Sequence, residues 1–222
     1  GLHWYKKIVE KRSNPYENYS MDFYANFFKS SEKENGKIVI KSYMKIKNYY
    51  KAHSNLKDTI EINRIFADDA KNGLKLFEEH GTDLKIESDV LGEYKPNISN
   101  CKYYHDIWLS YNLKEPIKKG HKFVIVEEFN RNFLSNHLKF PAIYPSKRKE
   151  ISLCFEGLKP TNAYFQIRSG GGIIKENSIN IIEKDDCVYY FNYFWKKPKV
   201  GESLFIRWSW PSDVFLQERS EE

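Results

Sequence analysis

The stretch Pro116-Ile-Lys-Lys-Gly120 leads into His121-Lys-Phe-Val-Ile-Val-Glu-Glu-Phe129. Further along the chain, Pro198-Lys-Val-Gly201 leads into Glu202-Ser-Leu-Phe-Ile-Arg-Trp-Ser-Trp210. In both stretches a turn containing Pro, Lys and Gly precedes a run with apolar residues at every second position. Such a turn followed by two-residue alternation is typical of antiparallel β-sheet. The repeat therefore predicts two similar β units.

Composition supports the same fold class. Hydrophobic residues make up 41% of the 222 residues and aromatic residues 16%, which is typical of a globular chain rich in sheet. We predict an all-β fold of two antiparallel β-sandwich units with immunoglobulin-like topology and one or two short helices, with a single larger sandwich as the alternative. The expected organisation is an N-terminal helix or linker over 1–14, a first β-rich unit over 15–135 and a second sandwich over 136–222.

Apolar rows with a period of two locate the strands. A hairpin is expected around Glu34-Asn35-Gly36, because Asn-Gly readily adopts positive φ. The first arm carries the row Tyr19, Met21, Phe23, Ala25 and Phe27, and the second carries Ile38, Ile40, Met44 and Ile46. Five strands are expected in the second half, with the rows Ile151/Leu153/Phe155, Ala163/Phe165/Ile167, Ile179/Ile181, Cys187/Tyr189/Phe191/Tyr193/Trp195 and Leu204/Ile206/Trp208/Trp210.

Two segments have helical patterns. Leu2–Arg12 places apolar residues on one helical face, and Ser13-Asn14-Pro15 would end that helix. Asp68–His80 has capping aspartates at its start and Gly81 after its end. These are the short helices of the predicted fold.

Positive charge is concentrated in one part of the chain. The formal net charge is +6, and the segment Lys114–Arg168 alone holds 11 Lys and Arg against 5 Asp and Glu. A basic surface attracts phosphates, nucleic acid or an acidic partner. The alternative is an ordinary solvated face, because the basic residues alternate with apolar ones as on the exterior of a strand.

A glycine-rich loop is the best candidate for binding an anion. Arg168-Ser169-Gly170-Gly171-Gly172, with Lys175 beyond it, could direct backbone N–H groups and two cations at a phosphate. The loop joins strands and does not open a helix, so it is not a nucleotide-binding loop of the known helical types. The simpler interpretation is a flexible hairpin loop.

Aromatic residues also occur on the polar faces of the expected strands. They are exposed candidates for stacking on bases or sugars, for protein interfaces, or for packing between sheets. The set comprises Tyr104, Trp108, Tyr164, Tyr190, Phe194 and Phe205, of which Trp108 and Tyr164 are the expected ligand-binding members.

No residue pattern predicts catalysis, a cofactor or a metal. The sequence has no nucleophile elbow and no Cys-x-x-Cys or His-Glu-x-x-His spacing. Glu127 lies on the apolar row of Phe123 and Ile125, where it is either solvated at a strand end or held in a pocket. No catalytic residue, metal ligand or cofactor is therefore expected.

The cysteines indicate a reducing compartment. Cys101, Cys154 and Cys187 are odd in number and widely spaced, so we expect reduced thiols, buried in strands in the case of Cys154 and Cys187, and a cytoplasmic location. No stretch is long and apolar enough for a membrane span. Because the chain begins at Gly1, we expect it to be part of a longer protein.

These observations favour a non-enzymatic recognition domain, a sensor or interaction module of a larger protein. Its expected partner is another protein or a neighbouring domain. The alternative is binding of a phosphorylated ligand, a nucleotide or single-stranded nucleic acid through the basic, aromatic-rich surface. A hydrolase with an unrecognised site is a weaker alternative.

Overall fold

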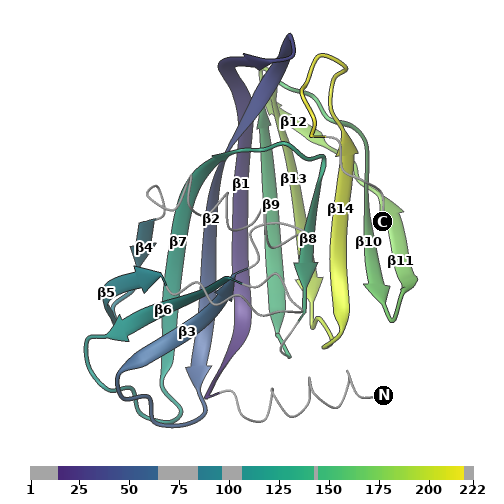
Figure 1. Cartoon of the computed structure of the whole chain (residues 1–222). Helices are drawn as coiled ribbons and strands as arrows, with labels where there is room; N and C mark the ends of the chain where they lie inside the picture. The colour runs from purple at the N-terminus through teal and green to yellow at the C-terminus, as the bar shows by residue number, and fades with distance from the viewer. Residues whose placement is uncertain (1–14, 65–84, 97–106, 143–144, 218–222) are drawn as a thin grey trace. The chain divides into compact units, whose positions relative to one another are not determined.

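A computed structural model describes residues 15–64, 85–96, 107–142 and 145–217, and over these ranges the chain is all-β (Figure 1). It forms 14 strands, and no helix occurs among the described residues. The all-β prediction is confirmed. The helices predicted over Leu2–Arg12 and Asp68–His80 lie outside the described residues. Within the described ranges no helix of membrane-spanning length and apolarity was found.

The strands form three sheets, shown in Figure 1. The largest has the order β12 (Ile182–Asp185), β13 (Val188–Lys196), β9 (Arg148–Glu156), β1 (Tyr16–Glu34), β2 (Lys37–Ala52), β7 (Lys122–Asn132) and β4 (Lys85–Glu87). A four-stranded sheet has the order β11 (Gly172–Ser178), β10 (Thr161–Ser169), β14 (Glu202–Ser209) and β8 (His137–Pro141). A three-stranded sheet has the order β3 (Thr59–Arg64), β6 (Ile107–Leu113) and β5 (Leu91–Pro96).

The immunoglobulin-like arrangement of the prediction is not confirmed. β1 pairs with β9 in parallel, from Ser20 opposite Arg148 to Phe28 opposite Glu156. β1 and β2 are also long, at 19 and 16 residues. Sandwiches of the immunoglobulin type consist of shorter strands in antiparallel sheets. What the strand order supports is the coarser description, an all-β fold of the sandwich kind.

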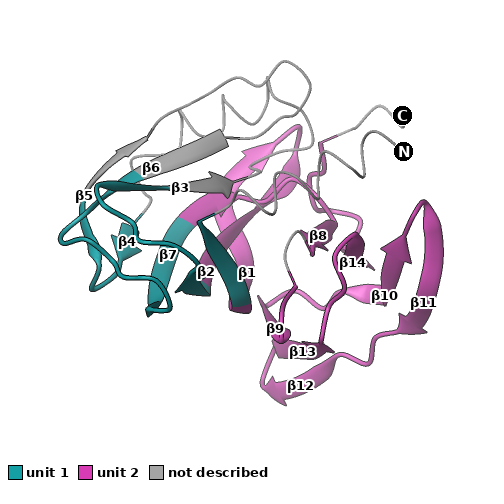
Figure 2. Ribbon diagram, turned by 90° about the horizontal axis from the view of Figure 1, so that it is seen from below, with its two compact units in different colours: residues 1–19, 47–129 teal, residues 20–46, 130–222 magenta. Residues whose placement is uncertain are grey.

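The chain divides into two compact units (Figure 2). Unit 1 comprises residues 1–19 and 47–129, and unit 2 comprises residues 20–46 and 130–222. The hairpin segment 20–46 therefore groups with the C-terminal half of the chain. The predicted division into 15–135 and 136–222 stays a prediction, because compactness does not test which segment folds independently.

Unit 2 is a pair of sheets packed face to face. Phe155 of β9 contacts Trp208 of β14 with ring centroids 5.4 Å apart, and Phe165 of β10 contacts Tyr193 of β13 at 4.4 Å. Trp208 is 1% exposed, as its place in a core row predicted. The predicted rows of Phe155 and Trp208 are buried throughout. In the row of Phe27 all members are buried except Tyr19, which is half-buried, and the other rows are buried in part.

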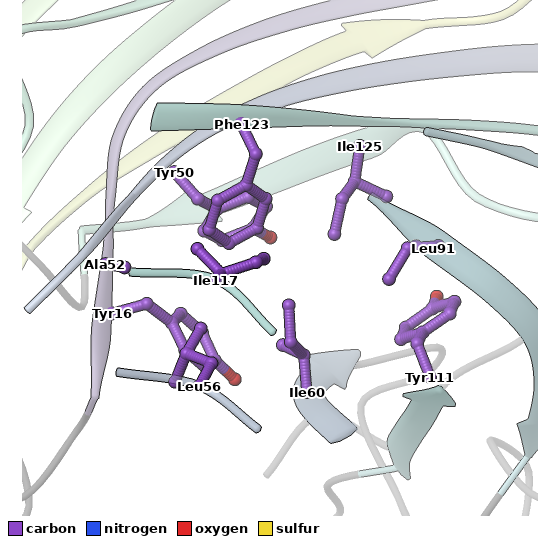
Figure 3. Close-up of a cluster of buried hydrophobic side chains, with 10 residues drawn as sticks. All are labelled: Tyr16, Tyr50, Ala52, Leu56, Ile60, Leu91, Tyr111, Ile117, Phe123 and Ile125. Atoms are coloured by element: carbon purple, nitrogen blue, oxygen red, sulfur yellow. The ribbon is translucent and has the colours of Figure 1, made fainter. Parts of the chain in front are cut away.

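Unit 1 has its own hydrophobic core, shown in Figure 3. Side chains from the three-stranded sheet and from β1, β2 and β7 point toward one another there. Tyr50 stacks on Phe123 with ring centroids 5.4 Å apart, and Tyr16 meets Tyr50 edge-on at 5.7 Å. The cluster comprises Tyr16, Tyr50, Ala52, Leu56, Ile60, Leu91, Tyr111, Ile117, Phe123 and Ile125.

The two Pro and Gly turns have the same geometry. His121 N–H donates to Lys118 O at 3.1 Å, and Glu202 N–H donates to Lys199 O at 3.0 Å. The glycine at the third position of each turn has φ near +90°, +87° for Gly120 and +91° for Gly201. These are the signatures of a type II β-turn, which favours glycine at that position. The repeat in the sequence is therefore a repeat in structure.

Other local predictions have mixed outcomes. The hairpin at Asn35 and Gly36 is confirmed, with φ of +50° and +75° joining β1 to β2. The strand predicted through Ile179 and Ile181 is wrong, because β11 ends at Ser178 and β12 begins at Ile182. Cys187 is also misplaced, since it lies exposed in the β12–β13 turn with φ of +59°.

Candidate functional site

The glycine loop is a tight hairpin turn between β10 and β11. Ser169 pairs with Gly172, so Gly170 and Gly171 are the two turn residues, with φ of +57° and +82°. Positive φ at both central positions is the type I′ geometry that joins two antiparallel strands. The hairpin interpretation of this loop is confirmed. Anion binding by Gly170, Gly171 and Gly172 stays a prediction.

The hairpin does not bring Arg168 and Lys175 together. Lys175 pairs with Ile167, and its Nζ lies 5.7 Å from the ring centre of Phe165. Phe165 and Ile167 belong to the buried side of the sheet. Arg168 follows Ile167 along the strand and therefore lies on the opposite face. The two cations predicted to share one anion are on different faces of the four-stranded sheet.

Arg168 instead belongs to a cluster on the outer face of that sheet. On β14, Phe205 and Arg207 alternate with the core residues Leu204, Ile206 and Trp208. Lys139 of β8 is directly opposite Phe205, and His137 is directly opposite Arg207. Directly opposed residues of paired strands share a face. We name this surface the cationic face and define it by His137, Lys139, Gln166, Arg168, Phe205 and Arg207.

Phe205 is the centre of the cationic face. The guanidinium carbon of Arg168 lies 4.1 Å from the Phe205 ring centre, and that of Arg207 lies 5.2 Å from it. Phe205 lies on the outer face beside cations, as predicted, but it is only 6% exposed, so its predicted exposure is wrong. Its ring is covered by the two arginine side chains and contributes a cation–π attraction to each.

A hydrogen-bond chain orients Arg168. Its Nε donates to Gln166 Oε1 at 2.8 Å, and its Nη2 donates to the same oxygen at 2.5 Å. The amide nitrogen of Gln166 donates to Glu176 of β11. Gln166 is itself buried, so the chain fixes the guanidinium plane against Phe205.

His137 lies beside these cations. Its ring centre is 5.2 Å from that of Phe205, and Nδ1 lies 3.0 Å from Ser135 Oγ. Burial lowers the pKa of His137, and the positive charges of Arg207, Arg168 and Lys139 lower it further. The same charges show that the four basic residues lie within electrostatic reach of one another.

The remaining predicted aromatic residues are spread over several surfaces. Tyr164 lies directly opposite Arg207, half-buried at the border of the cationic face. Phe194 is 51% exposed on β13, and Tyr190 carries Lys184 Nζ 3.9 Å above its ring centre. Trp108 is placed in β6, but its side chain lies outside the described residues, as does all of Tyr104.

The other candidates do not form a chemical site. Glu127 is 1% exposed, so the predicted alternative of a solvated carboxylate at a strand end is wrong. Burial, followed by the charge of Glu156, raises the pKa of the half-buried Cys154 thiol. The charge of Asp186 and a hydrogen bond to it raise the pKa of Cys187. In the described ranges no group of three or more His, Cys, Asp or Glu could hold a metal ion.

Sequence reasoning did not find His137, Lys139 and Arg207. The alternation of β14 places Phe205 and Arg207 on one face, and this signal was present in the sequence. The pairing of β8 with β14 brings in His137 and Lys139, and that register depends on tertiary structure. His137 and Arg207 are 70 residues apart in the chain.

Comparisons with known proteins leave the family open. No protein-family model matches the chain, and no curated protein matches it. Similar solved structures include an M1 zinc metallopeptidase from Deinococcus radiodurans, at a TM-score of 0.45 and 7% identity over 87% of this chain and 42% of that chain. A two-domain M1 zinc metallopeptidase mutant bound to L-tryptophan matches at 0.45 and 7%, over 87% and 43%. The chain thus spans less than half of each solved chain, and no activity follows from a similarity of this size.

Proposed function

We propose that the protein is a non-enzymatic recognition domain that binds an anionic, phosphate-bearing ligand on the cationic face of unit 2. The observation that carries the proposal is the pair of guanidinium groups, of Arg168 and Arg207, held against Phe205 at 4.1 and 5.2 Å. Lys139 and His137 add basic groups beside them.

The arginines are positioned before a ligand arrives. An unrestrained arginine loses side-chain entropy when it binds, and a guanidinium already stacked on a ring and hydrogen-bonded loses less. Arg168 has both restraints, Phe205 below its plane and the Gln166 amide oxygen at its edge. A planar guanidinium in a fixed orientation suits the geometry of phosphate oxygens.

The layout of the charges supports an extended ligand. Lys139, Arg207 and Arg168 lie on three neighbouring strands. Neighbouring strands are about 4.8 Å apart, so the outer two strands are roughly 10 Å apart. Cations spread over a sheet face can follow successive phosphates of a flexible strand, and guanidinium planes also accept stacked bases. Single-stranded nucleic acid is the ligand that this layout favours.

A second candidate is an acidic surface of a partner protein. Ile173 lies directly opposite Arg168 and is 56% exposed, and the next residue, Ile174, is 60% exposed. Exposed apolar residues beside cations are typical of a protein interface. A competition experiment distinguishes the two candidates. An oligonucleotide should displace a nucleic acid from the cationic face, but it should not displace a partner protein whose interface lies partly outside that face.

The arrangement around His137 argues for binding and against catalysis. The Ser135 hydroxyl also accepts the backbone N–H of His137 at 3.3 Å, so it caps the turn that precedes β8. A serine nucleophile needs a base that can become an imidazolium. In the ligand-free protein the cations Arg207, Arg168 and Lys139 disfavour that charge.

The proposal keeps three further expectations. A cytoplasmic location is supported by free thiols at Cys154 and Cys187. A partner that is another protein or a neighbouring domain is compatible with the exposed Ile173 and Ile174. An immunoglobulin-like relationship is supported by the packed pair of sheets in unit 2, although the parallel β1–β9 pair counts against it.

The test is the binding of a labelled single-stranded oligothymidylate, measured by fluorescence anisotropy at increasing salt. Affinity should fall steeply with ionic strength, because phosphate neutralisation releases counterions. The double variant Arg168→Gln with Arg207→Gln should weaken binding about tenfold or more, since hydrogen bonds to charged groups are each worth about 1.5–3 kcal/mol.

The matched control is Lys175→Gln with Lys184→Gln, which removes the same charge outside the cationic face. Lys175 lies on the opposite side of its sheet, and Lys184 lies on β12. If both double variants weaken oligonucleotide binding equally, the effect comes from net charge and not from the cationic face. If the arginine variant binds like the wild type, the ligand does not bind at the cationic face.

A further inference from the structure

His137 is the one member of the cationic face whose charge changes near neutral pH. It lies on β8 directly opposite Arg207 of β14. Its ring is 5.2 Å from the Phe205 ring, the same ring on which Arg168 and Arg207 stack. A ligand held by these arginines therefore lies next to the imidazole.

Three described basic residues place positive charge near His137. Arg207 comes from β14, Arg168 from β10 and Lys139 from β8 itself. Within the described ranges, Glu176 of β11 brings a carboxylate to this face, where it accepts a hydrogen bond from the Gln166 amide. Burial and then the three cations keep the pKa of His137 below its usual value of 6.5. The imidazole is thus neutral at pH 7 in the ligand-free protein.

The site is equipped to hold the imidazolium once the repulsion is relieved. Nδ1 lies 3.0 Å from Ser135 Oγ and 3.3 Å from Asn136 Oδ1, and both oxygens can accept an N–H hydrogen bond. A proton on Nδ1 would therefore have an acceptor in place.

An anion on the cationic face changes this balance. Negative charge near Arg207 and Arg168 offsets their effect on the imidazole and favours its charged form. Linkage is reciprocal, so a ligand that promotes protonation is bound more tightly by the protonated protein. Binding therefore becomes tighter at low pH, by the same factor by which the ligand favours the protonated imidazole.

We propose that a phosphate-bearing ligand binds the cationic face together with a proton taken up by His137, so that its affinity rises as the pH falls. This inference rests on the proposed function and adds its regulation. The phosphate ligand is retained in an acidic environment and released more readily above neutral pH.

Acid should strengthen ligand binding, but it should lower the folding stability of the ligand-free protein. A histidine whose folded pKa lies below its unfolded value takes up its proton more readily when unfolded. The ligand-free protein should therefore lose stability as the pH falls through about 6.5, the unfolded value. Bound ligand should reduce that loss, which separates a coupled proton from a general effect of acid.

The experiment uses a 5′-hydroxyl oligothymidylate carrying a pH-insensitive rhodamine label. Its phosphodiesters do not titrate between pH 5.5 and 8, so a change in affinity over that range comes from the protein. Wild-type affinity, measured by anisotropy at fixed ionic strength, should rise several-fold and at most about tenfold from pH 8 to pH 5.5. Calorimetry in two buffers of different ionisation enthalpy should show net proton uptake on binding toward the acidic end of this range.

His137→Gln is the decisive variant, because glutamine is neutral and keeps a hydrogen-bonding side chain. Whatever its affinity at pH 8, it should show no rise in affinity toward pH 5.5. His121→Gln is the control, since His121 is an exposed residue directly after Gly120 in unit 1 and should leave the pH dependence intact.

The outcomes separate the two proposals. A wild-type affinity that is flat with pH, or a rise that persists in His137→Gln, overturns the inference while arginine-dependent binding keeps the proposed function. Failure of the oligonucleotide to bind at any pH overturns both. Loss of the rise in His137→Gln alone, with proton uptake by the wild type, supports the inference.

Discussion

The turns that end at Gly120 and at Gly201 make the same three hydrogen bonds in the two units. Each glycine N–H donates to an alanine carbonyl, Ala52 at 2.8 Å and Ala142 at 3.0 Å. Each alanine N–H donates back to the residue after the glycine, His121 at 2.9 Å and Glu202 at 2.8 Å. The third bond closes the turn. A short sequence pattern thus fixes one local geometry in two separate cores.

The strands that follow these turns differ in what their faces contain. β7 continues its buried row from Phe123 and Ile125 to a carboxylate, Glu127, at 1% exposure. β14 keeps an apolar buried row and carries Phe205 and Arg207 on its outer face. The same local sequence therefore gives the same turn geometry in both units. The residues on each face of the following strand depend instead on the strands that pack against it.

The largest expected effect is that of Trp208→Ala in β14. Trp208 contacts Phe27, Phe155 and Trp210, with ring centroids about 5.5 Å apart. Truncating a buried Trp costs about 3–5 kcal/mol. Urea unfolding should therefore show strong destabilisation, and Ile125→Ala on β7 should cost about 2–5 kcal/mol in unit 1.

Phe194→Ala is the control for these core variants, because Phe194 is 51% exposed. Its stability should stay within about 0.5 kcal/mol of the wild type. A wild-type unfolding curve for Trp208→Ala would show that the inner and outer faces of β14 are exchanged.

A smaller effect is expected when alanine replaces either turn glycine. In Gly120→Ala and Gly201→Ala the added Cβ meets nothing within 4 Å, so the cost comes from positive φ alone. That strain is about 1–3 kcal/mol for a non-glycine residue, and it should be equal at the two sites if the turns are equivalent. Thermal unfolding of both variants measures it.

Gly172→Ala is the matched control for the turn glycines. Gly172 lies in a strand, and its added Cβ would meet Ser169 O at 3.7 Å, an ordinary contact. Its substitution should leave stability unchanged or slightly raised. Clearly unequal losses at Gly120 and Gly201 would contradict the equivalence of the two turns.

The smallest expected loss of stability comes from removing the side-chain hydrogen bond that each turn makes. Lys119 N–H donates to Asn55 Oδ1 at 2.9 Å, and Lys199 N–H donates to Glu202 Oε2 at 3.1 Å. Asn55→Ala and Glu202→Ala should each lose about 0.5–1 kcal/mol, since both bonds are exposed. Chemical denaturation measures the loss, and Asn55→Asp and Glu202→Gln, which keep an acceptor oxygen, should restore most of it.

The candidate site shows where prediction from the sequence ended. Arg168 and Tyr164 were identified and lie on or beside the cationic face, but the partner assigned to Arg168 was wrong. Lys175 is near in sequence, yet the hairpin register and a bulge after Ile167 place it on the other face. His137 and Lys139 were not predicted, because the sequence does not specify that β8 pairs with β14.

The sequence by itself determined the all-β class, the places of the two glycine turns and several buried rows, because these follow from two-residue alternation and from the φ that glycine permits. Only the tertiary structure decided that Phe205 is covered by two arginines and that His137 joins them. Strand order and register are long-range choices, set by which apolar faces pack together, and they place side chains that no local pattern connects.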